Sequence, residues 1–131
     1  MKQLTKAEEQ VMQILWDLND GVAKDVVDRF EEPRPAYTTV ATVLKVLEKK
    51  GFVRSRKVGN VNLFSPLITK KEYTGFQFTS LLKNYFNGSF PKMATFFASE
   101  NNLSIEELEE ILKITETELK KTKEQKPWKR Y

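Results

Sequence analysis

Apolar residues recur at helical spacing at the start of the chain and predict a first helix. Thr5 and Glu8 stand three positions apart, which is the pattern of a capping box at a helix N-terminus. The Asn-Asp-Gly run at 19–21 is typical of a helix end. A shorter helix is expected over 22–30, before the prolines of 33–35 interrupt the chain. The stripe of the first helix consists of Leu4, Ala7, Val11, Ile14, Leu15 and Leu18.

The segment from Tyr37 to Lys50 also has an apolar and a polar face at helical spacing, and it predicts a third helix. Gly51 follows directly and is a typical helix stop. The apolar stripe of this helix is Val40, Val43, Leu44 and Leu47. The opposite face is expected to present Thr38, Ala41, Thr42, Lys45 and Lys49.

Two short runs with alternating polarity, 52–56 and 61–65, predict a β-hairpin. Residues 57–60 lie between the two runs and form the expected turn, in which Gly59 and Asn60 can adopt positive φ. Pro66 ends the second run, because proline cannot donate to a strand ladder.

The remainder of the chain is predicted to be helical. Capping boxes recur at Thr69–Glu72 and Ser104–Glu107, and each is expected to open a helix. The helix from the first box ends at the Asn-Gly pair 87–88, and a short helix over 91–99 follows. The tail over 120–131 is polar and basic and is expected to fray.

Three helices followed by a hairpin are typical of the winged variant of the helix-turn-helix motif. The predicted fold class is therefore mainly α with a small β-hairpin. Residues 1–68 form the winged-helix domain, 69–123 form a helical C-terminal arm, and 124–131 form a polar tail.

Composition removes several classes of protein. The 131 residues include no cysteine and no histidine, which excludes disulfides, thiolate metal sites and Cys-His or Ser-His-Asp catalysis. The acidic cluster at 106–110 lies at a predicted helix N-terminus, where capping and the helix dipole explain it. We therefore expect no enzymatic activity, no metal and no cofactor. The sequence also shows no secretory signal and no membrane span, so a cytoplasmic location is the expectation.

Positive charge is concentrated in one part of the chain. The net charge is only +4, but residues 37–71 carry eight basic residues and one acid. This segment covers the predicted third helix and the hairpin, and such a local excess is typical of a surface that binds a polyanion.

Two functions fit this pattern. A helix that presents threonine and lysine fits the DNA major groove, and basic residues on a wing can contact the neighbouring backbone. The alternative is a winged-helix module for protein–protein interaction, in which the same polar residues are merely solvated. The candidate DNA-binding residues are Tyr37, Thr38, Thr39, Thr42, Lys45, Lys49, Arg54, Arg56, Lys57 and Asn60.

Four runs carry a family resemblance that spans roughly residues 4–120. They are LTKAEEQVMQILW at 4–16, TVATVLKVLEKKGFV at 39–53, LFSPL at 63–67 and LSIEELEEIL at 103–112. The chain resembles the penicillinase repressor family, the winged-helix regulators of bacterial β-lactamase and methicillin-resistance genes. The resemblance implies a transcriptional repressor that binds a pseudo-palindromic double-stranded DNA operator as a homodimer.

The C-terminal arm supports the dimer independently. Residues 72–131 hold ten of the fifteen aromatic residues, which is more than a few short helices can bury within one subunit. The alternative is that these side chains pack back onto the winged helix. The candidate dimerisation residues are Phe76, Phe78, Leu82, Tyr85, Phe86, Phe90, Phe97, Leu108, Ile111 and Leu112.

The chain also departs from the family pattern. Thr38 and Ala41 stand where better-known members have a lysine and an arginine, and Tyr37 replaces a proline, so the operator sequence is not carried over. The resemblance implies control by a membrane sensor protease or its effector, through cleavage of an Asn-Phe bond. The matching pair here is Phe96 and Phe97, which could equally be two core aromatics. A copper-sensing branch of the family needs cysteines, which this chain lacks.

Overall fold

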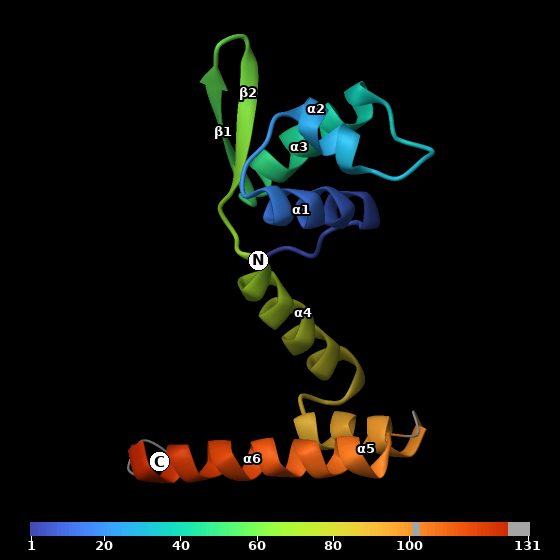
Figure 1. Cartoon of the computed structure of the whole chain (residues 1–131), viewed down its shortest axis with the longest axis vertical. Coiled ribbons are helices and arrows are strands. Elements are labelled where there is room, and N and C mark those ends of the chain that lie inside the picture. Colours follow the sequence, from blue (N-terminus) through green and yellow to red (C-terminus); the bar gives the residue numbers. More distant parts are fainter. Residues whose placement is uncertain (101–102, 126–131) are drawn as a thin grey trace. The chain divides into compact units, whose positions relative to one another are not determined.

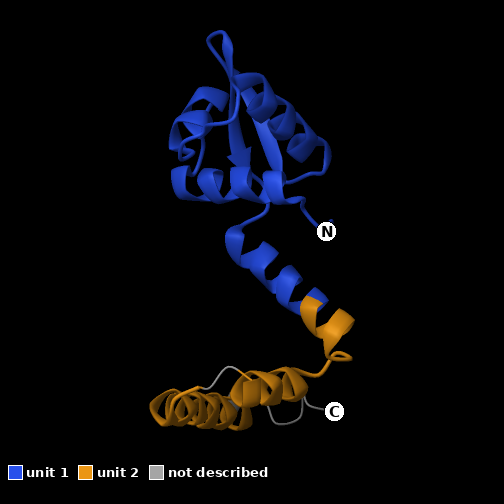
Figure 2. Cartoon of the chain, turned by 90° about the vertical axis from the view of Figure 1, so that its right-hand side faces the viewer, with its two compact units in different colours: residues 1–80 blue, residues 81–131 orange. Residues whose placement is uncertain are grey.

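The chain divides into two compact units, residues 1–80 and 81–131 (Figure 2). The computed structural model describes residues 1–100 and 103–125. We call the two parts the first unit and the second unit, and α4 contributes residues to both.

The first unit begins with three helices and one hairpin in the predicted order (Figure 1). The elements are α1 (Lys6–Leu18), α2 (Ala23–Arg29), α3 (Tyr37–Lys49), β1 (Val53–Val58) and β2 (Val61–Pro66). This order is that of a winged helix, and the fold class predicted from the sequence is confirmed. The hairpin turn is shorter than predicted, because Lys57 and Val58 belong to β1 and leave only Gly59 and Asn60 between the strands.

Local hydrogen bonds explain where α1 begins and ends. The Glu8 N–H donates to Thr5 Oγ1 at 3.2 Å, and the Thr5 N–H donates to Glu8 Oε1 at 2.9 Å, so the predicted capping box is present. Asn19 ends the helix with φ of 71°, a left-handed conformation that asparagine tolerates better than most residues. Both ends are therefore determined by residues within the segment itself.

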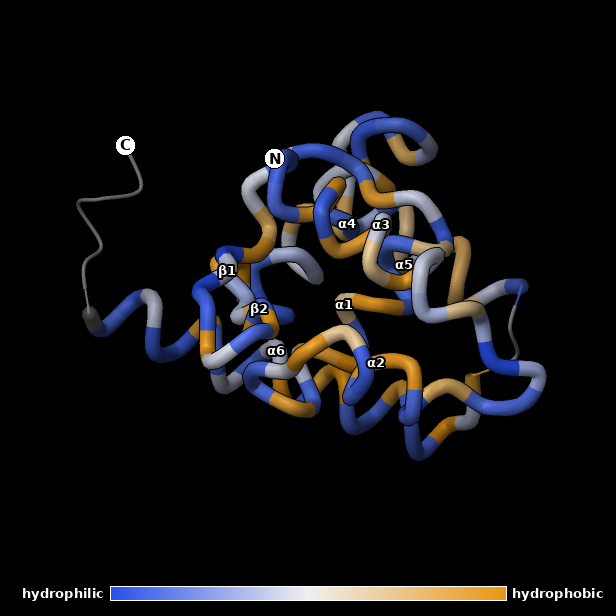
Figure 3. Tube along the Cα trace, turned by 90° about the horizontal axis from the view of Figure 1, so that it is seen from above, coloured by the Kyte–Doolittle hydropathy of each residue, from blue (hydrophilic) through white to orange (hydrophobic). Residues whose placement is uncertain are grey.

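One hydrophobic core fills the first unit, and each of its helices and strands contributes to it. Figure 3 shows hydrophobic and hydrophilic stretches alternating along the helices, as expected where one face is buried. Gly21 adds a connection that sequence patterns did not predict. It exchanges two backbone hydrogen bonds with Phe64, at 3.0 and 2.8 Å, and so fixes β2 to the turn after α1. The core residues are Leu4, Val11, Met12, Leu15, Ala23, Val26, Val40, Leu44, Leu47, Phe52, Val53, Phe64 and Tyr73.

The first turns of α4 (Lys70–Tyr85) pack with the winged helix. Tyr73 is buried, and its hydroxyl accepts a hydrogen bond of 3.0 Å from the Leu4 N–H. Phe76 packs on the Tyr73 ring at 5.9 Å between centroids. The first unit therefore extends past the boundary expected at residue 68. Phe76, one of the candidate dimerisation residues, is partly buried against the core of the first unit.

The second unit contains the end of α4, then α5 (Phe90–Glu100) and α6 (Ile105–Gln125). After α4, Asn87 and Gly88 both have positive φ, and the Gly88 N–H donates to the Leu82 carbonyl at 2.8 Å. The helix α6 continues to Gln125, so the fraying expected from residue 120 is wrong for 120–125. The rest of that expected tail, 126–131, lies outside the described residues. Within 1–100 and 103–125, no helix is both long and apolar enough to cross a membrane.

Candidate nucleic-acid interface

One face of α3 is exposed along its whole length. Thr38 and Thr42 lie on this face, and the Thr42 hydroxyl donates to the Thr38 carbonyl at 2.9 Å, so its donor is already used within the helix. Tyr37, at the start of the helix, is 55% exposed. Ala41 was expected on the exposed face. It is half-buried and packs against the core, so this expectation is wrong. The other exposed candidates on this helix are Thr39, Lys45 and Lys49.

The strand register separates the basic residues of the wing into two sets. Lys57 pairs with Asn62, and Ser55 pairs with the buried Phe64, so these side chains share the hairpin face that carries Phe64. Arg54 and Arg56 lie on the opposite face, which we call the outer face of the hairpin. All three cations are exposed, as predicted, but only Lys57 shares a face with the core-directed residues.

The candidate cations are available for a partner. In residues 1–100 and 103–125, none of Lys45, Lys49, Arg54, Arg56 and Lys57 forms an ion pair. A phosphate that binds them therefore displaces no internal salt bridge.

Lys50 behaves differently, although it belongs to the same basic segment. Its Nζ donates to Glu8 Oε1 at 2.6 Å, and the Glu8 side chain is 8% exposed. Burial of Glu8 raises the pKa of its carboxyl, but the hydrogen bonds from Lys50 and Thr5 outweigh burial and lower that pKa overall. Lys50 thus joins α1 to the end of α3, which the sequence did not indicate because the two residues are 42 positions apart.

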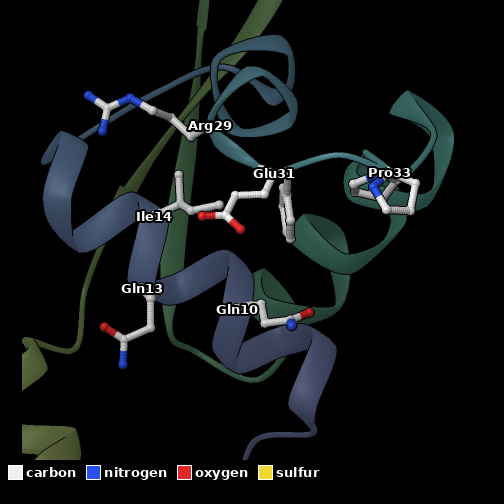
Figure 4. Close-up of a pocket in the computed structure, with 8 residues that line it drawn as sticks. Gln10, Gln13, Ile14, Arg29, Glu31 and Pro33 are labelled. Carbon is white, nitrogen blue, oxygen red and sulfur yellow. The ribbon is translucent and has the colours of Figure 1, made fainter.

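Two of the hollows on the described part of the first unit lie beside its helices. The larger, of about 570 Å³, lies between α1, α2 and the segment after α2. Figure 4 shows Gln10, Gln13 and Ile14 lining it from α1, with the Arg29 guanidinium extending away from the Glu31 carboxylate. Its lining mixes one cation with one acid and does not include the exposed face of α3.

The smaller hollow, of about 290 Å³, lies between the start of α2, α3 and the hairpin, and we call it the α3–wing hollow. Its polar lining residues are Lys24, Tyr37, Lys45, Asn60 and Asn62. Three of these, Tyr37, Lys45 and Asn60, were predicted DNA-binding residues. Lys24 and Asn62 were not predicted, since their proximity to α3 depends on the hairpin register and on the fold.

The acidic residues at the start of α6 have a structural explanation. The Glu107 carboxylate accepts a hydrogen bond of 3.2 Å from the Ser104 N–H, and the Ser104 hydroxyl accepts one of 3.1 Å from the Glu107 N–H. This capping box agrees with the prediction made for the acidic cluster. The part of the chain that the structure describes contains no group of three or more side chains suited to hold a metal.

A winged helix in which the third helix, here α3, and the wing both expose cations is typical of DNA-binding transcriptional regulators. A family model described as the penicillinase repressor matches residues 4–117. The chain therefore belongs to the penicillinase repressor family, whose members are transcriptional repressors and not enzymes.

Named relatives agree with the family. The penicillinase repressor of Bacillus licheniformis is 28% identical over 123 residues, which are 93% of this chain and 96% of that protein. The methicillin resistance regulatory protein MecI of Mammaliicoccus sciuri is 23% identical over 113 residues, or 86% of this chain and 92% of that protein. Among solved structures, a mutant of Lactococcus lactis ZitR in apo form superposes weakly. The TM-score is 0.40 at 16% identity, over 89% of this chain and 83% of that one.

Proposed function

We propose that this protein is a homodimeric repressor that binds a pseudo-palindromic DNA operator through α3 and the wing. The observation that carries the proposal is the set of exposed cations on α3 and the hairpin, none of which has an ion-pair partner in residues 1–100 or 103–125. Lysine and arginine in this arrangement neutralise phosphates and release counterions, which gives strong, salt-dependent binding.

In this proposal, the exposed face of α3 recognises the base sequence of the operator. A helix fits the major groove, which is about 12 Å wide, and small polar side chains let it approach the base edges. Thr39 and Thr42 are exposed here, and the Thr42 methyl can contact a thymine methyl because its hydroxyl is turned to the backbone. Lys45 and Lys49 lie further along the helix, where they can reach phosphates.

The wing supplies positive charge beside the helix. Lys57 shares the face of Asn62 and is placed to contact the strand that borders the groove. Arg54 and Arg56, on the outer face, contribute to the field that attracts DNA.

The second unit is the proposed dimer interface. Met93 is the one apolar side chain that is buried among residues 81–100 and 103–125. Phe86 and Phe96 contact each other at 5.7 Å between centroids, but Phe96 is still 49% exposed. The remaining apolar side chains of this unit that stay exposed are Leu81, Tyr85, Phe90, Phe97, Ile105, Leu108, Ile111, Leu112, Ile114 and Leu119.

So many exposed apolar side chains are unfavourable in water, and a small helical unit of this kind is stable when a second copy covers them. A twofold dimer then presents two α3 helices, and its operator carries two half-sites separated by about one helical turn or a multiple. Leu82 and Phe86 are already half-buried within the unit, so they contribute less to this interface than the exposed residues.

The regulated genes are proposed from the relatives, two of which are named for penicillinase and methicillin resistance. We therefore propose that the protein acts in the bacterial cytoplasm and represses an antibiotic-resistance gene. Release by a membrane sensor protease or its effector, through cleavage between Phe96 and Phe97, is part of the same proposal. This bond lies inside α5, so the helix has to open locally before a protease can bind it.

Fluorescence anisotropy and sedimentation test the proposal together. The full chain is titrated into a labelled fragment of its own promoter and into a scrambled fragment of equal length. We expect nanomolar affinity for the promoter, weaker binding to the scrambled fragment, and a free protein of twice the 15.3 kDa chain mass. Equal affinity for both fragments, or a monomer at micromolar concentration, contradicts it.

Leu112→Asp is the variant that addresses the interface, since it places a charge on an exposed apolar position of α6. We expect it to shift the protein toward monomer and to weaken operator binding. Thr117→Asp is the matched control, because Thr117 is an exposed polar residue of the same helix and receives the same charge. An equal shift in both variants contradicts the assignment of the apolar face.

A further inference from the structure

The α3–wing hollow combines hydrogen-bond donors, positive charge and apolar surface. Tyr37, Ala41 and Lys45 line it from one side, and their spacing of four residues places them on a single stripe of α3. Asn60 and Asn62 line it from the hairpin. Apart from Phe64, its apolar lining consists of small or β-branched side chains, Val22, Ala23, Ala41 and Val61, and the residues that line it include no acid.

The two charged side chains that line the hollow, Lys24 and Lys45, are both cations. Lys45 forms no ion pair with any residue of 1–100 or 103–125. Lys24 pairs with Asp28 at 3.2 Å, but the two side chains are 75% and 52% exposed, so this pair is weak and readily exchanged. The hollow therefore favours an anion that also has an apolar part.

The position of the hollow identifies which anion reaches it, given the proposed function on which this inference rests. A helix about 10–12 Å across fills a major groove of about 12 Å, so each side of it faces a sugar-phosphate strand. The wing stands beside α3 in the same unit (Figure 1), and Lys57 and Asn62 share one face of it. We therefore expect the strand that borders the groove on this side to pass between α3 and the wing, over the hollow.

We propose that the α3–wing hollow binds one deoxyribose-phosphate unit of the operator backbone, and we call this contact the seat. The Asn62 amide and the Tyr37 hydroxyl donate to phosphate oxygens, and Lys45 supplies the charge. Ala41 and Val61 contact the sugar. Since none of these groups reaches a base, the contact fixes the position of α3 in the groove without reading sequence.

Asn62→Ala and Tyr37→Phe test the seat, because each removes a neutral donor and leaves the charge unchanged. We expect each to weaken binding about tenfold per half-site, by the same factor for operator and scrambled DNA, since each chain of the dimer loses a hydrogen bond to a charged group. The slope of log K against log salt stays that of the wild type, since neutral donors release no counterions. Lys45→Ala is expected to reduce this slope by about 1.8 for a dimer.

Gln3→Ala is the matched control, since it removes an exposed amide at the N-terminus, at the end of the first unit away from the wing tip (Figures 1 and 2). Asn62→Asp, with Gln3→Glu as its control, adds a charge and is expected to weaken binding about a hundredfold per half-site. Unchanged melting temperatures show that the variants fold, as expected for exposed positions.

The possible outcomes separate this inference from the proposed function. If the Asn62 and Tyr37 variants bind like the wild type while Lys45→Ala loses affinity, the protein binds DNA through α3 and the seat is refuted. A loss confined to the operator, with scrambled DNA unaffected, shows a base contact and also refutes the seat. If the wild type itself shows no salt-dependent DNA binding, both the proposed function and the seat are refuted.

Discussion

Replacing Lys45 and Lys57 together by alanine tests the electrostatic part of the proposed interface. Lys45 projects from α3, and Lys57 projects from the hairpin face that also carries Asn62. Neither forms an ion pair within residues 1–100 or 103–125, so the double variant loses no internal salt bridge. We therefore expect unchanged folding stability and a change confined to DNA binding.

The magnitude follows from counterion release. A dimer of the double variant loses four phosphate contacts, and each contact contributes about 0.9 to the slope of log K against log salt. The slope should therefore become less steep by about 3.6. A rise from 50 to 200 mM salt lowers the affinity of both proteins. The factor of this loss should be roughly 150 times larger for the wild type than for the variant.

Fluorescence anisotropy with an operator fragment at four or more salt concentrations gives both slopes. Lys2→Ala with Lys6→Ala is the control, since it removes two exposed lysines at the N-terminal end of the first unit. The reasoning is refuted if the control and the Lys45/Lys57 variant change the slope equally, because net charge alone then accounts for the effect.

Further variants test the fold and the wing. Lys50→Met should destabilise the protein by about 2 kcal/mol in urea unfolding, less than for a fully buried pair, because the Lys50 side chain is 23% exposed. Glu8→Gln keeps the capping box, and its deficit relative to the wild type should disappear as pH falls. Because the folded pKa of Glu8 is lowered, its stabilisation is complete above the unfolded pKa of about 4.3 and is lost as pH falls through the folded pKa, so an acid-resistant deficit contradicts this. Tyr73→Phe should cost about 1–2 kcal/mol by leaving the buried Leu4 N–H unpaired, and a neutral result in thermal unfolding would disprove that role. Arg54→Ala with Arg56→Ala should flatten the salt slope less than the Lys45/Lys57 pair does, and an equal change would show that the outer face also contacts phosphates.

The elements of the fold could be predicted because their signals are local. The capping boxes at Thr5, Thr69 and Ser104 each satisfy backbone donors within one helical turn, and all three are present. The apolar stripe of α3 predicted its buried face, including Val40 and Leu44. These features depend on residues three or four positions apart, which a single sequence displays directly.

The features that were missed depend on contacts between distant residues. The Tyr73 hydroxyl accepts a hydrogen bond from Leu4, 69 positions away, so the first unit extends beyond residue 68. Phe76 packs on the Tyr73 ring and therefore belongs to the same unit. The assignment of wing cations to two faces depends on the register that pairs Lys57 with Asn62. A shift by one residue exchanges the two faces, and the composition of the strands does not determine that shift.

Hydroxyl-radical footprinting of the promoter, combined with the stoichiometry of the complex, tests the central claim most directly. The account predicts two chains per site and two symmetric protected regions whose centres lie about one helical turn, or a multiple of it, apart. Both protections should disappear together as salt rises. A single protected region with one chain bound, or no protection at moderate salt, would contradict a dimeric winged-helix repressor.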